Sequence, residues 1–209
     1  MKQYTFPAGE ETKTKLAPAI AYARQFILAN GTRTLNLDQL ASDLHIAKKT
    51  LYKEFPTKEI FIEYVLFDIY HELFTESRAV QLDPKDPLRC FYELMNVLFR
   101  HFSRLNSRTV LDVKLFFPRV WKEVKEFEQE IINRILDSFQ KADDLNLLRK
   151  KFDLKFTADF IYKMLENTFQ PEILINAPYS IADMIKLIVD IIMNGIMDKQ
   201  FTFNFSDDE

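Results

Sequence analysis

Glycine is scarce in this sequence, with 3 residues among 209, against a usual frequency of about 7%. Sheet proteins rich in hairpins, and nucleotide-binding folds with glycine-rich loops, need many backbone positions with positive φ, which glycine occupies at the lowest cost. Both classes are therefore disfavoured. The hydrophobic content of 47% is too high for a disordered chain, so we expect a packed core.

Cysteine and long apolar runs are similarly rare. The single cysteine, Cys90, excludes an intramolecular disulfide and fits a reducing compartment. The longest apolar stretches, such as Ile185 to Ile196, are interrupted by charged or amide side chains, whereas a membrane span needs about 20 clean residues. The first residues contain no continuous apolar segment of the kind found in secretory signals. We therefore expect a cytoplasmic protein without a membrane contact.

The charges are distributed unevenly along the chain. Residues 1–60 contain nine basic and six acidic side chains, which gives this segment a net charge of +3. Because the whole chain has a net charge of −3, the remaining residues carry a net charge of −6. A basic segment beside a larger acidic one indicates that only the first part contacts a polyanion. A few surface lysines are common, however, and the charge pattern alone is weak evidence.

Prolines divide the chain into segments of helical length. Pro18 fits the first turn of the first helix, Asn36 with Gln39 fits a capping box, and Ser180 with Asp183 fits the cap of the last helix. The expected helices cover about residues 14–30, 37–44, 47–54, 57–78, 87–105, 109–117, 118–141, 157–169 (closed by Pro171) and 180–199. Phe201, Phe203 and Phe205 occupy every second position, which fits an extended tail that packs one face against another part of the structure. The alternative is a chain end that is frayed and exposed to solvent.

Two short helices joined by about three residues, the second of them basic, are typical of a helix-turn-helix motif. An apolar seam holds the two helices together, and it consists of Leu37, Leu40, Ala41, Leu44, Ile46 and Leu51. The opposite face carries lysine, threonine and tyrosine side chains that can meet bases or phosphates in a major groove. A short basic helix is more often a solvated surface than a recognition helix, so the pattern by itself leaves both interpretations open.

The stretch from Ala23 to Ile60, ARQFILANGTRTLNLDQLASDLHIAKKTLYKEFPTKEI, resembles the DNA-binding domain of the TetR family of transcriptional regulators. The resemblance is ungapped, and the run TLYKEFPTKE is highly specific. The matching positions are Ala23, Phe26, Ile27, Gly31, Leu40, Ala41, Ile46, Thr50, Leu51, Tyr52, Phe55, Lys58 and Glu59. The rest of the chain agrees only in its helical pattern. The residues expected to contact DNA are Asn36, Lys48, Lys49, Thr50, Tyr52, Lys53, Thr57 and Lys58.

Three positions depart from the family pattern, in which glycine, serine and glycine are expected at His45, Ala47 and Lys49. His45 must occupy a turn position that often needs positive φ, which histidine tolerates better than most residues. Ala47 removes the usual hydroxyl cap, and Lys49 adds a charge where the backbone usually approaches DNA closely. These departures affect the seating of the recognition helix.

The resemblance implies an all-α fold with two parts. Residues 1–56 would form a three-helix DNA-binding domain, and residues 57–209 a helical domain for dimerisation and effector binding. The protein would be a dimeric repressor that binds an inverted-repeat DNA operator. A small apolar or amphipathic effector would release it from this operator. No metal or cofactor is implied. The residues expected to line the effector pocket are Tyr64, Phe67, His71, Phe99, Phe117, Trp121 and Met164, although a buried, satisfied role is the commoner one for His71.

The last helix is apolar around most of its circumference, with one narrow polar stripe. Such a helix is buried on more than one side, either inside its own domain or against a second subunit. The resemblance favours the subunit interface, because the last two helices form it in this family. The residues expected there are Phe160, Met164, Met184, Ile188, Ile191 and Ile192.

Two other functions fit a helical chain less well. A di-metal carboxylate enzyme needs Glu-x-x-His on two helices, and the nearest approach is a single Asp68 with His71. A serine or cysteine nucleophile lacks its usual setting here. A helical protein-binding adaptor with an incidental basic face remains the alternative to a DNA-binding regulator, and a steep loss of DNA affinity with salt distinguishes the two.

Overall fold

The computed structural model of the chain describes residues 10–149, 153–168 and 170–196. Regular secondary structure in these residues is entirely helical, apart from an isolated β-bridge between Asp83 and Asp86. The predicted all-α class is therefore confirmed. None of the described helices has the length and apolar character that a membrane crossing requires. The Phe201, Phe203 and Phe205 tail lies outside the described residues.

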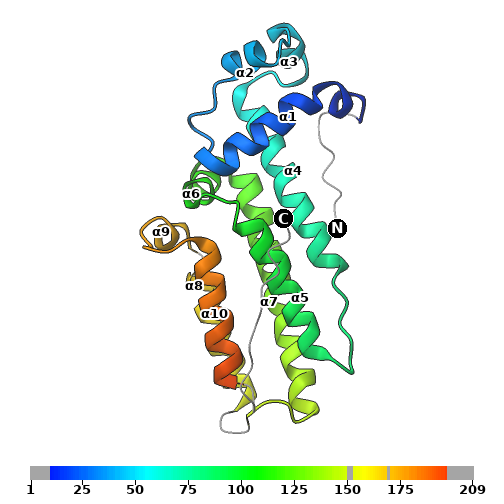
Figure 1. Cartoon of the computed structure of the whole chain (residues 1–209), viewed down its shortest axis with the longest axis vertical. Helices are drawn as coiled ribbons and strands as arrows, with labels where there is room; N and C mark the ends of the chain where they lie inside the picture. Colours follow the sequence, from blue (N-terminus) through cyan, green and yellow to red (C-terminus); the bar gives the residue numbers. More distant parts are fainter. Residues whose placement is uncertain (1–9, 150–152, 169, 197–209) are drawn as a thin grey trace.

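Ten helices make up the described part of the chain. The first five are α1 (Glu10–Asn30), α2 (Leu37–Asp43), α3 (Lys48–Glu54), α4 (Lys58–Ala79) and α5 (Pro87–Phe102). The others are α6 (Ser107–Phe116), α7 (Pro118–Asp144), α8 (Leu154–Thr168), α9 (Pro171–Leu174) and α10 (Ile181–Ile196). Figure 1 shows an elongated molecule with α2 and α3 at one end and with α4, α5 and α7 running along its length.

One core of buried apolar side chains runs through the molecule. It begins between α1, α2 and α3 with residues such as Leu40 and Leu51, continues through Phe61 on α4, and extends to Phe91 and Ile135 on α5 and α7. Helix α4 contacts α1, α5 and α7. The three N-terminal helices, which we call the N-terminal unit, are therefore attached to the rest of the chain by a continuous core.

Most helix ends follow the predicted signals. Ser180 and Asp183 cap the last helix reciprocally: the Asp183 carboxylate accepts from the Ser180 amide at 3.2 Å, and the Ser180 hydroxyl accepts from the Asp183 amide at 3.1 Å. Asn36 caps α2 by accepting from the Asp38 and Gln39 amides. The predicted capping box is only half formed, because the Gln39 side chain donates to Asp43 instead.

One expectation about a helix end was wrong, and one short helix was not predicted. Helix α1 begins at Glu10, so Pro18 lies inside the helix and not in its first turn. The missing amide hydrogen of Pro18 leaves one carbonyl of the preceding turn without its helical donor. Pro171, expected only to close the preceding helix, occupies the first turn of the short helix α9, because proline is favoured at that position.

Candidate functional site

Helices α2 and α3 are joined by a tight turn with a left-handed residue. His45 has φ 53°, as the sequence predicts. The Ile46 amide donates to the Ala41 carbonyl at 2.8 Å and the His45 amide donates to the Ser42 carbonyl at 3.1 Å. These two bonds form a Schellman motif, which satisfies the last carbonyls of α2. The turn thereby fixes the direction in which α3 leaves α2.

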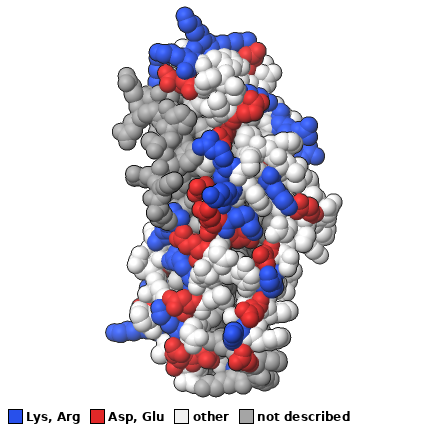
Figure 2. All heavy atoms as spheres, turned by 180° about the vertical axis from the view of Figure 1, so that it is seen from behind, with Lys and Arg blue, Asp and Glu red and all other residues white. Residues whose placement is uncertain are grey.

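Helix α3 presents a basic face to solvent. Leu51 is fully buried, whereas Lys48, Lys49, Tyr52 and Lys53 are exposed. Figure 2 shows lysine and arginine side chains gathered over the end of the molecule where α2 and α3 lie. A helix with its side chains is about 10–12 Å in diameter, and a major groove about 12 Å wide admits it.

The lysines of this face differ in their partners. The ammonium of Lys48 pairs with the Asp38 carboxylate at 2.9 Å, whereas Lys49 and Lys53 have no ion pair with any residue that the structure describes. Ala47 provides no side-chain cap to α3, as expected. The first turn of α3 therefore retains unpaired amides, which favour an anion.

The remaining predicted DNA contacts lie at helix starts beside α3. Thr57 caps α4 by accepting from the Ile60 amide at 3.2 Å, and Asn36 caps α2. The Lys58 ammonium donates to the Arg33 carbonyl at 3.1 Å. Thr50 is half-buried. The structure therefore gives Asn36 and Thr57 a capping role and places Lys58 at the start of α4, over the loop between α1 and α2.

A polar joint, formed by Asn106, Thr109 and Asp112 of the α6 region, holds the end of α1. The Asn106 side chain donates to the Ala29 carbonyl at 3.0 Å, and the Thr109 hydroxyl donates to the Ile27 carbonyl at 2.7 Å. The Ala29 carbonyl is one of those that the end of a helix leaves without partners, whereas the Ile27 carbonyl also accepts from the Gly31 amide at 3.0 Å. The polar joint therefore completes α1 with side chains from a distant part of the chain.

Asp112 is the acidic residue of the polar joint, and it is 3% exposed. Its carboxylate accepts from the amide and from the hydroxyl of Thr32, both at 2.8 Å. Gly31, with φ 82°, precedes Thr32, and a Cβ there would lie 3.1 Å from the Asp112 carboxylate. Glycine is therefore required at position 31 both by the backbone conformation and by this close approach.

Asp112→Ala is expected to lower the free energy of unfolding by about 2–4 kcal/mol, because two buried donors of Thr32 lose a charged acceptor. Urea denaturation followed by circular dichroism measures this loss. Asp137→Ala is a suitable control, since that carboxylate is exposed and pairs only with Lys141 on its own helix. Equal midpoints for Asp112→Ala and the control would contradict the role assigned to Asp112.

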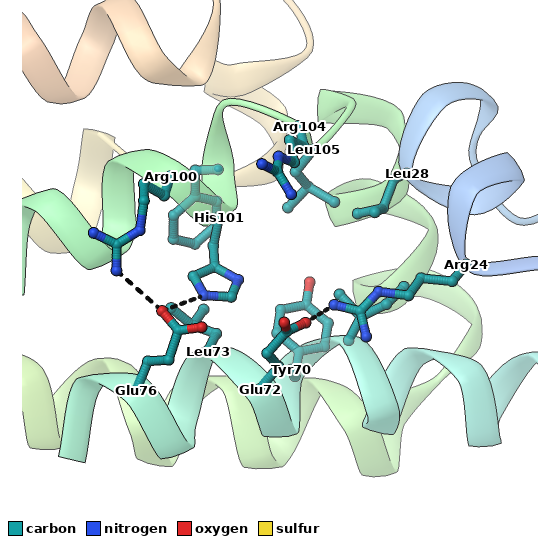
Figure 3. A pocket seen from close by; sticks show the side chains of 12 residues that line it. Arg24, Leu28, Tyr70, Glu72, Leu73, Glu76, Arg100, His101, Arg104 and Leu105 are labelled. Atoms are coloured by element: carbon teal, nitrogen blue, oxygen red, sulfur yellow. Dashed lines mark hydrogen bonds and ion pairs between the residues drawn. The ribbon is translucent and has the colours of Figure 1, made fainter. Parts of the chain in front are cut away.

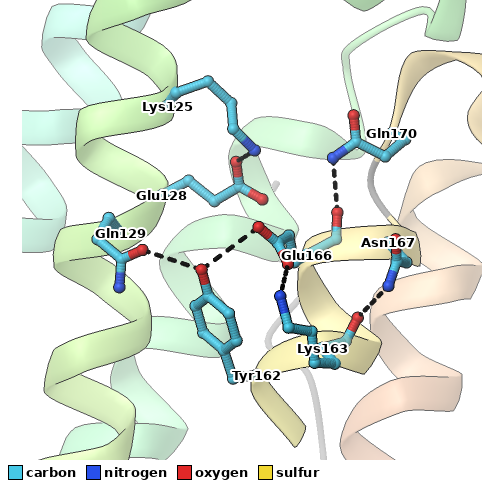
Figure 4. A network of polar contacts seen from close by, with 8 residues as sticks. All are labelled: Lys125, Glu128, Gln129, Tyr162, Lys163, Glu166, Asn167 and Gln170. Atoms are coloured by element: carbon cyan, nitrogen blue, oxygen red, sulfur yellow. Dashed lines mark hydrogen bonds and ion pairs between the residues drawn. The ribbon is translucent and has the colours of Figure 1, made fainter. Parts of the chain in front are cut away.

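A cavity of about 110 Å³, which we call the apolar cavity, lies between α4, α5, α7 and α10. Its lining is apolar except for Glu128, whose carboxylate pairs with Lys125 (Figure 4). The lining includes Leu73, Met95, Trp121, Phe127, Ile131 and Ile188.

Only one of the seven predicted pocket residues, Trp121, lines the apolar cavity. His71 is exposed, so the interpretation of a buried, satisfied histidine was wrong. The other five belong to the core or pack against it. Tyr64, Phe67, Phe99 and Phe117 are buried in the core, and Met164 is half-buried against it. No group of three potential metal ligands is brought together within the described residues.

A second cavity, of about 250 Å³, lies where α1, α4 and the end of α5 meet, and we call it the charged cavity. Figure 3 shows arginine, glutamate and histidine side chains around it. Its lining includes Arg24, Tyr70, Glu72, Glu76, His101 and Arg104. Tyr70, Leu73 and Phe102 line both cavities, so these three side chains form the wall between them.

A hydrogen bond from Tyr162 connects α8 to Gln129 on α7, and two further polar contacts lie within α8. The Tyr162 hydroxyl lies 3.2 Å from the Gln129 side-chain oxygen and 3.3 Å from the Glu166 carboxylate (Figure 4). Lys163 donates to the same carboxylate at 2.7 Å. These contacts orient α8 so that Ile161 is buried against the core.

Helices α8 and α10 also expose large apolar side chains. Their exposed fractions are 68% for Phe156, 64% for Phe160, 54% for Leu187 and 51% for Ile191. Of the six residues predicted at a subunit interface, Phe160 and Ile191 are exposed and Met164 and Met184 are half-buried. Ile188 and Ile192 are 5% and 3% exposed, and both belong to the chain's own core.

Sequence reasoning missed the polar joint and the charged cavity. The partners in the polar joint are 77 to 82 positions apart, and no local pattern connects them. The charged cavity did leave a signal: Asp68, Glu72 and Glu76 recur every four residues, and this spacing places three acids on one face of α4.

No protein-family model matches the sequence, and no curated protein matches it significantly. Solved structures do match. A TetR/AcrR family transcriptional regulator from Thermobifida fusca has a TM-score of 0.62 at 17% identity, over 87% of this chain and 98% of that one. The ketosteroid transcriptional regulator KstR2 of Mycobacterium tuberculosis has a TM-score of 0.59 at 16% identity, over 94% of this chain and 100% of that one.

The fatty acid degradation regulator FadR from Bacillus halodurans matches with a TM-score of 0.54 at 14% identity, over 90% of this chain and 97% of that one. These likenesses extend over almost the full length of the solved chains. The N-terminal resemblance and the arrangement of the helices thus agree, and the chain has the fold of the TetR family of transcriptional regulators.

Proposed function

We propose that this protein is a cytoplasmic, dimeric transcriptional regulator that reads DNA with α3. The observation that carries the proposal is the exposed basic face of α3, which a Schellman turn and the buried Leu51 hold at one end of the regulator fold. In this proposal residues 1–56 form the DNA-binding domain and residues 57–209 the domain for dimerisation and effector binding.

The residues of the proposed DNA contact have separate roles. Lys49, Tyr52 and Lys53 project from α3 and would reach base edges and phosphates in the major groove. Lys58, beside the first amides of α4, would bind a backbone phosphate. The pairing of Lys48 with Asp38 makes its ammonium less available, so we assign it to a phosphate at the edge of the contact.

We propose that α8 and α10 form the dimer interface through Phe156, Phe160, Leu187 and Ile191. These side chains are more than half exposed in the single chain, and burial against a second copy would remove them from water. A single helix of two turns contacts few base pairs, so two-fold symmetry and an inverted-repeat operator would double the specific contacts.

Lys49→Ala and Lys58→Ala test the DNA contact. A genomic fragment selected by the purified protein serves as operator, and its dissociation constant is compared with that of random DNA over a range of salt concentrations. Lys58→Ala should weaken both alike and reduce the salt slope by about one unit, since one phosphate contact is lost. Lys49→Ala should reduce the preference for the operator.

Lys85→Ala, in the loop between α4 and α5, is the matched control and should change neither constant. Equal losses on operator and random DNA for Lys49→Ala would contradict a base contact. A wild-type protein without a salt-dependent DNA affinity would reject the regulator and favour a protein-binding adaptor.

We propose that an apolar or amphipathic effector enters the apolar cavity and lowers operator affinity. The cavity of about 110 Å³ is smaller than ligand sites usually are, about 300 Å³ or more. An effector would therefore have to separate α7 or α10 from α4, and α4 begins beside α3. Such a movement would alter the distance between the two recognition helices of a dimer.

Reciprocity tests the effector proposal. Operator DNA must weaken effector binding by the factor by which the effector weakens DNA binding, typically about 5-fold to 150-fold. A library of apolar compounds is screened for thermal stabilisation, and each binder is titrated with and without operator. A library without any stabilising compound, or binders with equal affinity in both titrations, would reject the effector proposal.

A further inference from the structure

The charged cavity contains ion pairs that are already complete. The Arg24 guanidinium pairs with Asp68 at 3.1 Å and also with Glu72. The Glu76 carboxylate pairs with Arg100 at 3.1 Å and with the His101 Nε2 at 3.2 Å. Burial lowers the pKa of His101 below its usual value, although Glu76 opposes this effect.

Two donors around the charged cavity have no such partner. Arg104, in the connection between α5 and α6, makes no ion pair with the described residues, and its charge is the one left unbalanced in the lining. Tyr70 is only 4% exposed, yet its hydroxyl makes no hydrogen bond to a described residue. Figure 3 shows that hydroxyl pointing into the space between Arg24, His101 and Arg104.

A hydroxyl that faces a cavity without a hydrogen bond to the described residues offers its hydrogen to a ligand oxygen. A guanidinium beside it supplies a positive charge and further donors. The two groups together match one oxyanion, which accepts several hydrogen bonds and carries the opposite charge. Besides the charged side chains that already pair with one another, the wall contains apolar side chains, among them Leu28, Ile69 and Leu105.

We propose that the charged cavity binds a small organic monoanion, with a carboxylate held by Arg104 and Tyr70 and an apolar body against Leu28, Ile69 and Leu105. At about 30 Å³ per water-sized group, the volume of about 250 Å³ holds a ligand of about eight heavy atoms. This site goes beyond the proposed effector site, from which the wall of Tyr70, Leu73 and Phe102 separates it.

Hexanoate and hexanamide form the matched pair of probes, because they share size and apolar tail and differ in charge. Isothermal titration of the full chain should give a hexanoate affinity at least about tenfold above that of hexanamide, the difference expected for one charged hydrogen bond. Inorganic phosphate is the third probe, and it should bind more weakly than hexanoate because it leaves the apolar wall uncovered.

Arg104→Gln should weaken hexanoate binding by about tenfold or more. Its side chain is exposed and unpaired, so the variant is expected to unfold at the temperature of the wild type. Tyr70→Phe should weaken hexanoate binding as well, because the carboxylate loses a hydroxyl donor. Arg89→Gln, at the opposite end of α5, is the matched control and should leave all affinities unchanged.

Several results would overturn the proposal: no hexanoate binding at millimolar concentration, equal affinities for hexanoate and hexanamide, tighter binding of phosphate than of hexanoate, or an Arg104→Gln affinity equal to that of the control. Each is measured on free protein. Failure of the charged cavity as a ligand site is therefore distinguishable from failure of the proposed DNA binding, which the operator titrations measure separately.

Discussion

The double replacement Leu187→Asp and Ile191→Asp is expected to convert the proposed dimer into folded monomers. Both side chains are more than half exposed on α10, so a single chain tolerates the change. In a dimer, each new carboxylate would be buried without a partner, which costs about 2–5 kcal/mol at an interface. One buried, unpaired carboxylate weakens association by about 30-fold or more. A dimer of the double variant would contain four of them.

Sedimentation velocity at micromolar concentration measures this result, with circular dichroism to show that helix content is retained. The control replaces Leu115 on α6 and Leu145 after α7, which are 57% and 47% exposed, by aspartate. It should remain dimeric. A wild type that sediments as a monomer, or a double variant that dimerises like wild type, would refute an interface on α10.

Phe55→Ala is expected to lower the free energy of unfolding by about 3–5 kcal/mol, the usual cost of removing a fully buried phenyl ring. Phe55 follows α3 directly and is 0% exposed. Its ring lies 5.1 Å from the rings of Phe61 and Tyr64 on α4, edge to face in both cases. Its loss therefore detaches the end of α3 from α4, and operator affinity should fall as well.

Phe91→Ala separates the two consequences. Phe91 is also 0% exposed, but it lies near the start of α5 and packs on Phe139 near the end of α7, with ring centroids 5.1 Å apart. Urea denaturation should show a similar loss for both variants. Operator binding, measured well below the unfolding transition, should weaken only for Phe55→Ala. Equal weakening would mean that affinity follows overall stability and not the anchoring of α3.

Local signals in the sequence predict most of the helices, because prolines, caps and apolar spacing act over a few residues. His45 is a further case, since the resemblance places it at a turn position that often needs positive φ, and the structure has φ 53° there. Pro18 shows their limit. A proline is tolerated inside α1, where tertiary packing outweighs its intrinsic cost.

The cavities could not be predicted in the same way. Tyr64 and Tyr70 are aromatic, belong to one helix and are both buried, yet Tyr70 lines both cavities and Tyr64 lines neither. The difference depends on which side chains face them from α1, α5 and α7, and a single sequence does not contain that pairing. Periodicity shows that a face is apolar, but not where it is incompletely filled.

The polar joint affects the order in which the protein is completed on the ribosome. Ile27, Ala29 and Thr32 precede their partners by 77 to 82 residues. At about 5–20 residues per second, translation leaves the end of α1 in water for roughly 4 to 16 s before Asp112 is synthesised. The end of α1 is therefore synthesised early but completes its hydrogen bonds late, because their partners in the polar joint belong to the middle of the chain.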